Sequence, residues 1–192
     1  MSGLSRRLSV LAIPAIVAVS VLAASPIVPR AAARIPELEI GSRSVAGFSV
    51  DAATPYARAL RYFNRVAGPP DSTFAAGACT LRYRSIGLVL GFVALDPTRP
   101  ASAATCTFSR AVVTDRRWRT PGGLEVGASL AAMRRAYPKA FEAGTVAGSP
   151  GIPVGAKEWQ LASAAGNAAR PVLVAYVKRS RVAALGIRIA GH

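Results

Sequence analysis

Two stretches of the chain carry apolar residues at the spacing of an amphipathic helix. The apolar residues of the first stretch fall on one helical face: Tyr56, Leu60, Phe63 and Ala67. Thr54 is suited to the N-cap and Pro55 to the first helical position. The pattern therefore predicts a helix over residues 55–67, which the Gly-Pro-Pro run at 68–70 ends.

The second stretch follows a Gly-Gly turn at 122–123 and a short alternating strand at 124–126. Ser129 can accept hydrogen bonds from the free N–H groups of a helix start. Leu130, Met133 and Tyr137 then share one face, and Pro138 ends the helix. With about two turns, this helix depends on packing rather than on intrinsic propensity.

Elsewhere the apolar period is two, or the run is fully apolar, which predicts strands. Six such stretches occupy residues 79–84, 88–95, 106–114, 157–161, 172–178 and 182–189. The last two form a hairpin with Arg179-Ser180 at its turn, and residues 144–155 form a Gly- and Pro-rich loop. Leu38 to Ile40 alternate as an edge strand would.

The order of these elements favours an α+β fold, an antiparallel β-sheet with two short helices packed on one face. A Gly-apolar-x-Val turn at 47–50 and another at 123–126 each precede a helix and three strands. We therefore predict a tandem repeat, with residues 46–115 as the first unit and 116–192 as the second. One continuous domain over 46–192 is the alternative.

The N-terminus has the order of a secretory signal. Arg6 and Arg7 precede an apolar run from Leu8 to Ala24, and Ala31 to Ala33 offer a small-residue cleavage site. We predict a signal peptide over 1–33, a tether over 34–45 and a secreted or cell-envelope protein. A retained anchor is the alternative and is the only membrane attachment that the sequence indicates.

Cys79 and Cys106 are the only two cysteines, and both lie in the predicted exported part. An even number of cysteines in an oxidising compartment favours one disulfide. Two buried free thiols are the alternative, and metal ligation is disfavoured because the single histidine, His192, is the last residue.

The formal net charge of +15, from 24 basic and 9 acidic residues, favours anionic partners. Arg58, Arg61 and Arg65 fall on the polar face of the first predicted helix. They form either a solvated surface or an anion-binding stripe.

A second basic cluster surrounds Trp118 and comprises Arg116, Arg117 and Arg119. Such a combination could stack on bases or hold a cation–π contact. An exported protein seldom meets nucleic acid, so we expect Trp118 to be a core residue instead. Basic residues at the last hairpin's tip, Lys178, Arg179 and Arg181, form a solvated turn or guard a sheet edge.

The sequence lacks the residues that several common catalytic and cofactor-binding sites require. A lone terminal histidine excludes Ser-His-Asp and Cys-His hydrolysis in their usual form. No phosphate-binding glycine motif occurs, so no nucleotide cofactor is predicted, and no metal or other cofactor either. Scattered carboxylates leave a glycosidase-type pair open, since distant residues can meet in a fold.

The segment GLEVGASLAAMRRAYP at 123–138, with LRYRSIGLVLGF and the Trp-Arg-Thr before the turn, resembles an uncharacterised family of secreted actinobacterial proteins. It is more distantly similar to the folds of the beta-lactamase inhibitor protein and of the small outer-membrane assembly lipoproteins. That resemblance implies helices on one face of an antiparallel sheet, twice in tandem in the inhibitor. It implies no contact residues here, and the chain departs from these relatives in having one candidate disulfide and no lipobox.

Three functional hypotheses follow. The first is an exported, non-enzymatic binding or scaffold module, whose partner is a protein or an anionic cell-envelope component. The second is an inhibitor of a secreted hydrolase, which rests on the fold resemblance alone. The third is a carboxylate-dependent hydrolase.

Overall fold

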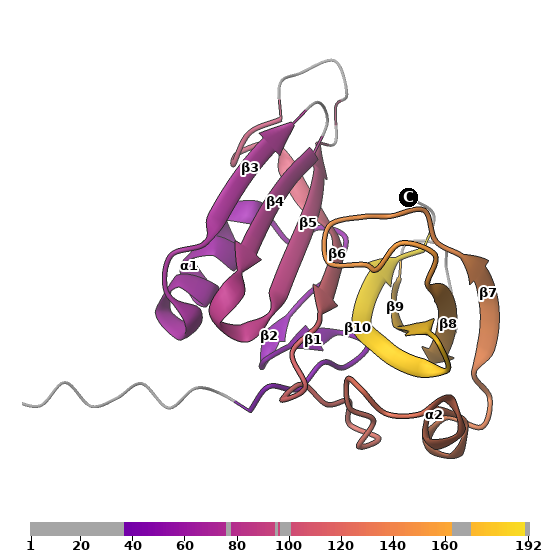
Figure 1. Ribbon diagram of the computed structural model, residues 1–192. Helices are drawn as coiled ribbons and strands as arrows, with labels where there is room; N and C mark the ends of the chain where they lie inside the picture. Colours follow the sequence, from indigo (N-terminus) through magenta and orange to yellow (C-terminus); the bar gives the residue numbers. More distant parts are fainter. Residues whose placement is uncertain (1–36, 76–77, 95, 97–100, 163–169, 191–192) are drawn as a thin grey trace, which may run out of the picture. The chain divides into compact units, whose positions relative to one another are not determined.

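The computed structural model (Figure 1) describes residues 37–75, 78–94, 96, 101–162 and 170–190. All of them belong to one structural unit, residues 33–192. The predicted signal peptide, the first residues of the predicted tether and His192 lie outside the described residues.

Eight antiparallel strands form one sheet in the order β3-β4-β5-β6-β10-β9-β8-β7. Their bounds are β3 Asp71–Ala75, β4 Ala78–Tyr83, β5 Leu88–Ala94, β6 Cys106–Val113, β7 Phe141–Thr145, β8 Lys157–Ala162, β9 Pro171–Lys178 and β10 Arg181–Ile189. A single 3₁₀ turn, η1 Arg84–Ile86, links β4 to β5. A separate two-stranded sheet pairs β1 Ser44–Val45 with β2 Phe48–Ser49.

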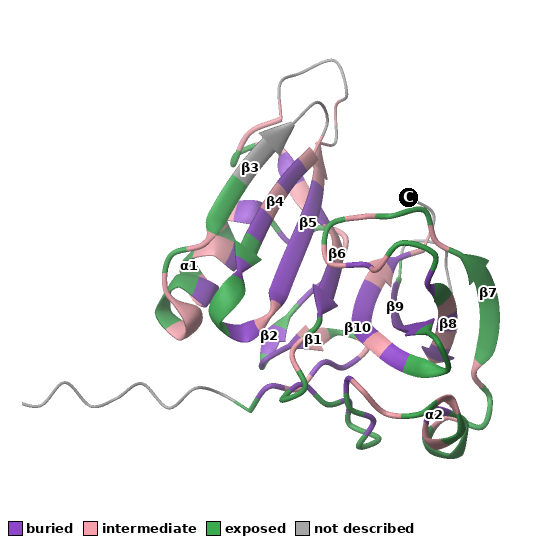
Figure 2. Cartoon of the chain, viewed as in Figure 1, coloured by how far each residue is buried: buried purple, intermediate pink, exposed green. Residues whose placement is uncertain are grey.

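Helix α1 (Tyr56–Ala67) and helix α2 (Leu130–Ala136) bury side chains in the same hydrophobic core. Tyr56 and Phe63 of α1 and Met133 of α2 are almost fully buried against inward residues of the sheet. Figure 2 shows β5 buried over most of its length, whereas β7 at the sheet's edge is exposed. The predicted α+β fold, an antiparallel sheet with two short helices, is thereby confirmed.

The helix starts differ in how they are capped. The hydroxyl of Ser129 accepts a hydrogen bond from the Ala132 N–H at 3.1 Å, so the predicted cap of α2 is confirmed. The predicted cap at Thr54 is wrong, because α1 begins at Tyr56 with Pro55 as N-cap. The Thr54 hydroxyl instead accepts from the Asp51 N–H at 2.9 Å and donates to the Asp51 carboxylate. The Thr54 hydroxyl therefore closes the turn at Asp51 and does not cap the helix.

All six predicted strands are present, as β4, β5, β6, β8, β9 and β10. Two further edge strands, β3 and β7, were not predicted, and β7 begins before and overlaps the predicted 144–155 loop. Residues 124–126 form no strand; Glu125 makes only an isolated bridge to Arg119. Ile40 makes an isolated bridge to Val45, and its fully buried side chain belongs to the core. From Leu38 onward, the residues of the predicted tether therefore contribute side chains to the core.

Each helix is followed by four strands, not the three that the sequence predicts. Strands β3 to β6 form one meander and β7 to β10 another, and the last strand of each meander pairs with the other. The two halves therefore share an order of elements. A duplication as the origin of that order stays a prediction.

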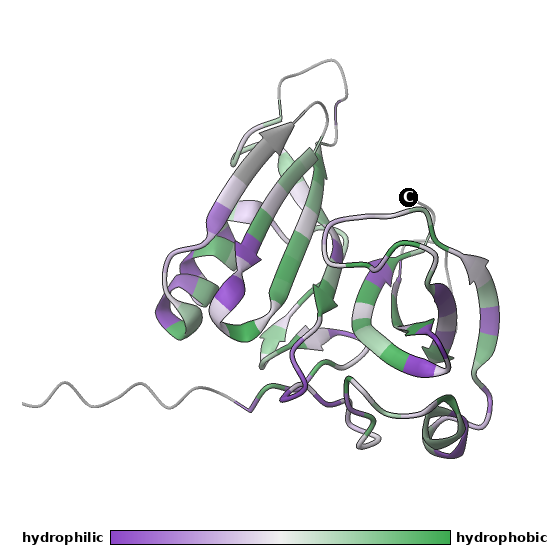
Figure 3. Ribbon diagram, viewed as in Figure 1, coloured by the Kyte–Doolittle hydropathy of each residue, from purple (hydrophilic) through white to green (hydrophobic). Residues whose placement is uncertain are grey.

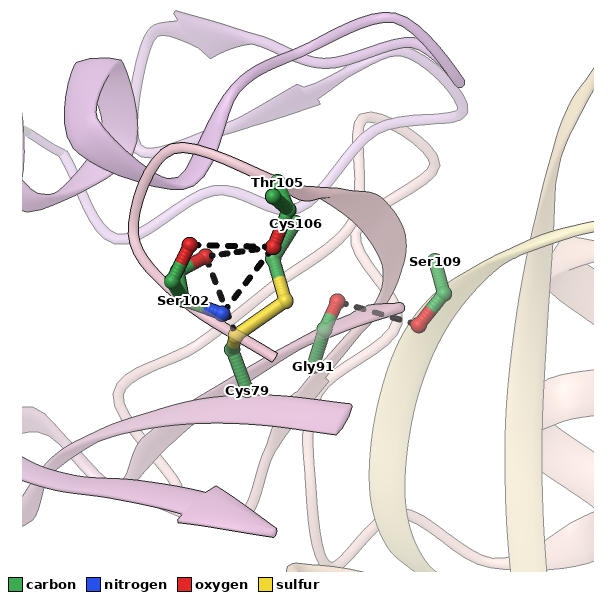
Figure 4. The surroundings of a disulfide bond; sticks show 6 residues. All are labelled: Cys79, Gly91, Ser102, Thr105, Cys106 and Ser109. Carbon is green, nitrogen blue, oxygen red and sulfur yellow. Dashed lines mark hydrogen bonds between the residues drawn. A yellow bond between two sulfur atoms is a disulfide. The ribbon is translucent and has the colours of Figure 1, made fainter. Parts of the chain in front are cut away.

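Cys79 in β4 and Cys106 at the start of β6 form a disulfide, as predicted, with their Cα atoms 6.4 Å apart. Strand β5 lies between these two strands in the sheet, so the bond spans a strand. A register shift at Gly91/Phe92 accompanies the β5–β6 pairing, and the 102–105 turn, closed by Ser102 and Thr105, leads into β6 (Figure 4). Both cysteines are buried in the core.

Candidate functional site

The predicted arginine stripe lies on the outer side of α1. Arg58, Arg61 and Arg65 are all exposed, and Figure 3 shows hydrophilic positions along this helix. Together with residues of the β1–β2 turn and β2 they line a hollow of about 350 Å³. We call this the arginine hollow; its residues are Gly47, Phe48, Ser49, Arg58, Arg61, Tyr62 and Arg65.

Aromatic packing fixes the base of the arginine hollow. The Tyr62 hydroxyl donates a hydrogen bond to the Ala46 carbonyl at 2.6 Å. The Phe48 ring lies 4.9 Å from the Tyr62 ring and 5.6 Å from that of buried Phe63. The Arg58 guanidinium stands over Phe48, 5.5 Å from the ring centroid, a cation–π contact that orients the side chain.

The charge of the arginine hollow is uncompensated. Within the described ranges, the side chains of Arg58, Arg61 and Arg65 form no ion pair or hydrogen bond, and no acidic residue lines the hollow. Positions 58 to 65 span about 10 Å along a helix axis. Guanidinium groups at such spacing bind carboxylate, phosphate or sulfate groups through forked hydrogen bonds.

The second predicted cluster is arranged differently. Trp118 is fully buried and its indole N–H donates to the Ile86 carbonyl at 2.6 Å, so it is a core residue with no exposed ring for stacking. Arg117 binds both oxygens of Asp115, at 3.0 and 2.8 Å, and these bonds hold the pKa of that carboxyl below its usual range. Arg119 pairs with Glu37. Arg116 is exposed beside Gly127.

Lys178 and Arg179 of the last hairpin line another cavity, of about 400 Å³, with residues from α2 and β8. Arg134 lies over the ring of Trp159 at 5.0 Å, and Lys157 pairs with Glu142 at 2.8 Å. The sequence did not indicate these contacts, because they join positions 15 and 25 residues apart.

Sequence reasoning also missed a cavity of about 310 Å³ on the sheet face opposite the helices. Its charged lining residues come from three strands: Arg110, Glu158 and Arg188. A sequence signal did exist, since Gly91 and Gly186 interrupt apolar strands, and an isolated glycine in a strand often marks a close approach of other groups.

None of the cavities described above is lined by two carboxylates among the described residues. The proposal of a carboxylate-dependent hydrolase gains no support from them and stays a hypothesis. Over the same residues, no group of three or more His, Cys, Asp or Glu side chains is arranged to hold a metal ion.

Neither a protein-family model, nor a curated protein sequence, nor a solved structure matches this chain. Among the helices of the described part, none is long and apolar enough to cross a membrane.

Proposed function

We propose that the protein is an exported, non-enzymatic binding module that holds an anionic polymer of the cell envelope in the arginine hollow. The observation that carries this proposal is the set of three exposed guanidinium groups on one helix face, with no acidic residue lining the hollow. The disulfide fits an oxidising compartment, and the signal-like N-terminus supplies the route of export.

A polymer suits the arginine hollow better than a folded protein does. Protein interfaces concentrate their binding energy in buried apolar or aromatic anchors. The aromatic residues of the hollow already make contacts within the protein, since Phe48 is buried and the Tyr62 hydroxyl donates to a backbone carbonyl. They are therefore not free to anchor a partner protein. What the surface offers is charge, and charge binds a repeating polyanion through many equivalent, salt-sensitive contacts.

The test is binding of the disulfide-bonded protein to poly-glutamate and to polyphosphate, measured by isothermal titration at several salt concentrations. The triple variant Arg58→Gln, Arg61→Gln, Arg65→Gln should lose about tenfold or more in affinity, because each charge-assisted contact contributes at least several tenths of a kcal/mol. Its matched control, Arg135→Gln, Lys139→Gln, Lys178→Gln, removes the same charge from other exposed positions.

Equal losses in the two triple variants would show that net charge alone attracts the polymer and would overturn the assignment to the hollow. Recovery of one envelope protein, unaffected by salt and blocked by the α1 variant, would replace the polymer by a protein partner.

An inhibitor of a secreted hydrolase is the second candidate. The observation that favours it is the shared order of the two halves, a helix followed by four strands, joined through β6 and β10. The sequence resemblance implies a tandem arrangement of this general kind. Nanomolar inhibition of a β-lactamase or peptidase would support this candidate, and a flat result across a broad panel would remove it.

A further inference from the structure

The sheet face opposite the helices is partly covered by the segment between β7 and β8. Ile152 and Ala156 of this segment are buried against sheet residues, with Val146 beside them. A Cβ at Gly151 would lie 3.2 Å from Val112 and Val89 side chains, so the segment is in close contact with β5 and β6. Figure 1 shows it reaching from β7 across toward β6.

Beneath and beside this segment lies the cavity of about 310 Å³. Apolar walls come from Val93, Val146 and Ile152. Seven residues with hydrogen-bonding side chains line it: Thr80, Ser109, Arg110, Ser149, Glu158, Tyr176 and Arg188.

Two strand glycines let large polar side chains lie flat over the sheet. Arg110 is the cross-strand partner of Gly91, and a Cβ at Gly91 would come within 2.9 Å of Arg110 Cγ and 3.0 Å of its Nε. A Cβ at Gly186 would lie 2.8 Å from the Ala111 carbonyl oxygen and 3.0 Å from the Tyr176 ring. Real side chains almost never tolerate such distances, so the floor of the cavity depends on both glycines.

The charges of this cavity do not cancel. Arg188 donates to Glu158 at 2.7 Å, and the Glu158 side chain is only 12% exposed. The half-buried side chain of Arg110 has no ion pair or hydrogen bond with any described residue, and neither does the Tyr176 hydroxyl. The Arg110 guanidinium and the Tyr176 hydroxyl therefore both have donors free for a ligand, and one anion would accept hydrogen bonds from both.

We propose that this cavity binds a small organic monocarboxylate, held by Arg110 and Tyr176 through its carboxylate. The guanidinium fork matches a carboxylate, and the phenol adds a third hydrogen bond. One unpaired positive charge suits a monoanion, whereas neighbouring Glu158 repels a second negative charge. At about 30 Å³ per water-sized group, the volume accommodates about ten non-hydrogen atoms, and the apolar walls receive the rest of the ligand.

The experiment titrates acetate, hexanoate, benzoate and inorganic phosphate into the ¹⁵N-labelled, disulfide-bonded protein. Amide shifts of Ser109, Arg110 and Tyr176 report binding. Hexanoate or benzoate should bind more tightly than acetate, which leaves the apolar walls empty, and more tightly than phosphate. Arg110→Gln should weaken that binding about tenfold, and Tyr176→Phe about fivefold, as expected for hydrogen bonds to a charged group.

Arg82→Gln is the matched control, because Arg82 is exposed on β4 and lies outside this cavity. It removes the same charge and should leave the affinity unchanged. Arg110→Lys keeps the charge and loses the fork, so it provides a second variant if Arg110→Gln fails to fold.

No saturable shift with any of the three carboxylates up to about 20 mM, beyond the millimolar range of weak ligands, would overturn the proposal. So would tighter binding of phosphate, or equal binding by the Arg110 variants. The α1 triple variant should bind hexanoate normally, so the two proposed sites can fail independently of each other.

Discussion

At the residue scale, the same side chain has three different environments in this protein. Arg117 and Arg119 are each paired with a carboxylate on the surface. Arg58 stands over an aromatic ring with its charge uncompensated, and Arg110 is half-buried without a partner among the described residues. Exposed ion pairs contribute little to stability. The unpaired arginines are therefore the ones whose positions a ligand would explain.

The buried Tyr176 should make the stability of the protein depend on pH in the alkaline range. Burial and, second, the neighbouring Glu158 raise its pKa, while Arg110 and Arg188 act in the opposite direction. An unfolded tyrosine ionises near pH 10, where the folded one keeps its proton. The unfolded state then binds fewer protons, so the free energy of unfolding should fall as pH rises above about 10.

This fall is measured by urea denaturation between pH 8 and about 11. Tyr176→Phe should show a smaller decline than the wild type. An identical decline would assign the effect to other groups, of which Tyr83, also raised in pKa by burial, is the first candidate.

Trp118 and Trp159 differ in a single hydrogen bond. Trp118 donates to the Ile86 carbonyl, whereas the buried indole N–H of Trp159 has no partner among the described residues. Trp118→Phe should cost about 2 to 4 kcal/mol, since it leaves a buried carbonyl unpaired as well as a void. Trp159→Phe loses volume but no hydrogen bond, and about 1 kcal/mol is expected. Chemical denaturation of both variants checks the difference.

At the element scale, the β9–β10 hairpin turns through residues that are poorly suited to it. Arg179 and Ser180 have φ angles of 50° and 61°, the left-handed region that a type I′ turn requires. Only glycine and asparagine adopt this region at low cost. The packing of the two long strands therefore holds a turn that its own sequence disfavours.

Arg179→Asn combined with Ser180→Gly should raise the free energy of unfolding by about 1 kcal/mol, because it removes that strain. Thermal and urea denaturation give the measurement. Lys178→Gln, which removes a charge beside the turn without changing its residues, should leave stability within about 0.5 kcal/mol of the wild type. Destabilisation by the Asn-Gly pair would contradict this account of the turn.

The disulfide acts at the same scale, since it ties β4 to β6 across an intervening strand. It closes a loop between positions separated by 27 residues. On the chain-entropy model, Cys79→Ala with Cys106→Ala should cost about 3 to 4 kcal/mol, mainly because the unfolded chain gains freedom. Denaturation under non-reducing conditions measures the loss. A cost below about 1 kcal/mol would mean that the β4–β5–β6 pairing already restricts this loop in the unfolded ensemble.

At the scale of the whole molecule, one hydrophobic core extends from Leu38 to Ile189 and includes both helices. The last strands of the two halves, β6 and β10, pair from Leu185↔Val113 to Arg188↔Arg110. Without the other half, each half would have an unpaired strand, β6 or β10, and part of this core would be exposed. We expect the described unit to unfold in one cooperative transition.

The two tryptophans test this expectation at different places. In Trp159→Phe, Trp118 reports on its contact with Ile86 of the first half, and in Trp118→Phe, Trp159 reports on β8. Within each variant, the fluorescence transition should coincide with the loss of far-ultraviolet circular dichroism. Separate transitions would indicate two independently folding units, as a pair of repeat domains over 46–115 and 116–192 would give.

The sequence could predict elements whose own residues decide them. The 3.6-residue period of Tyr56 and Phe63 specifies the amphipathic helix α1. Ser129 specifies where α2 begins. Alternation specifies six strands. The sequence could not predict the edge strands β3 and β7. Each pairs with one neighbour only, and this pairing, rather than an alternating hydrophobic pattern, makes them strands.

The candidate sites divide in the same way. The sequence by itself determined the arginine stripe of α1, since helical spacing is a local property, and it indicated the disulfide, since Cys79 and Cys106 are the only two cysteines. Only the tertiary structure decided that Trp118 is buried, that Arg117 and Arg119 are paired, and that Arg110 and Tyr176 meet in one cavity. The physical reason is strand order: β6 and β9 flank β10, which follows both along the chain, and only the folded sheet brings their side chains together.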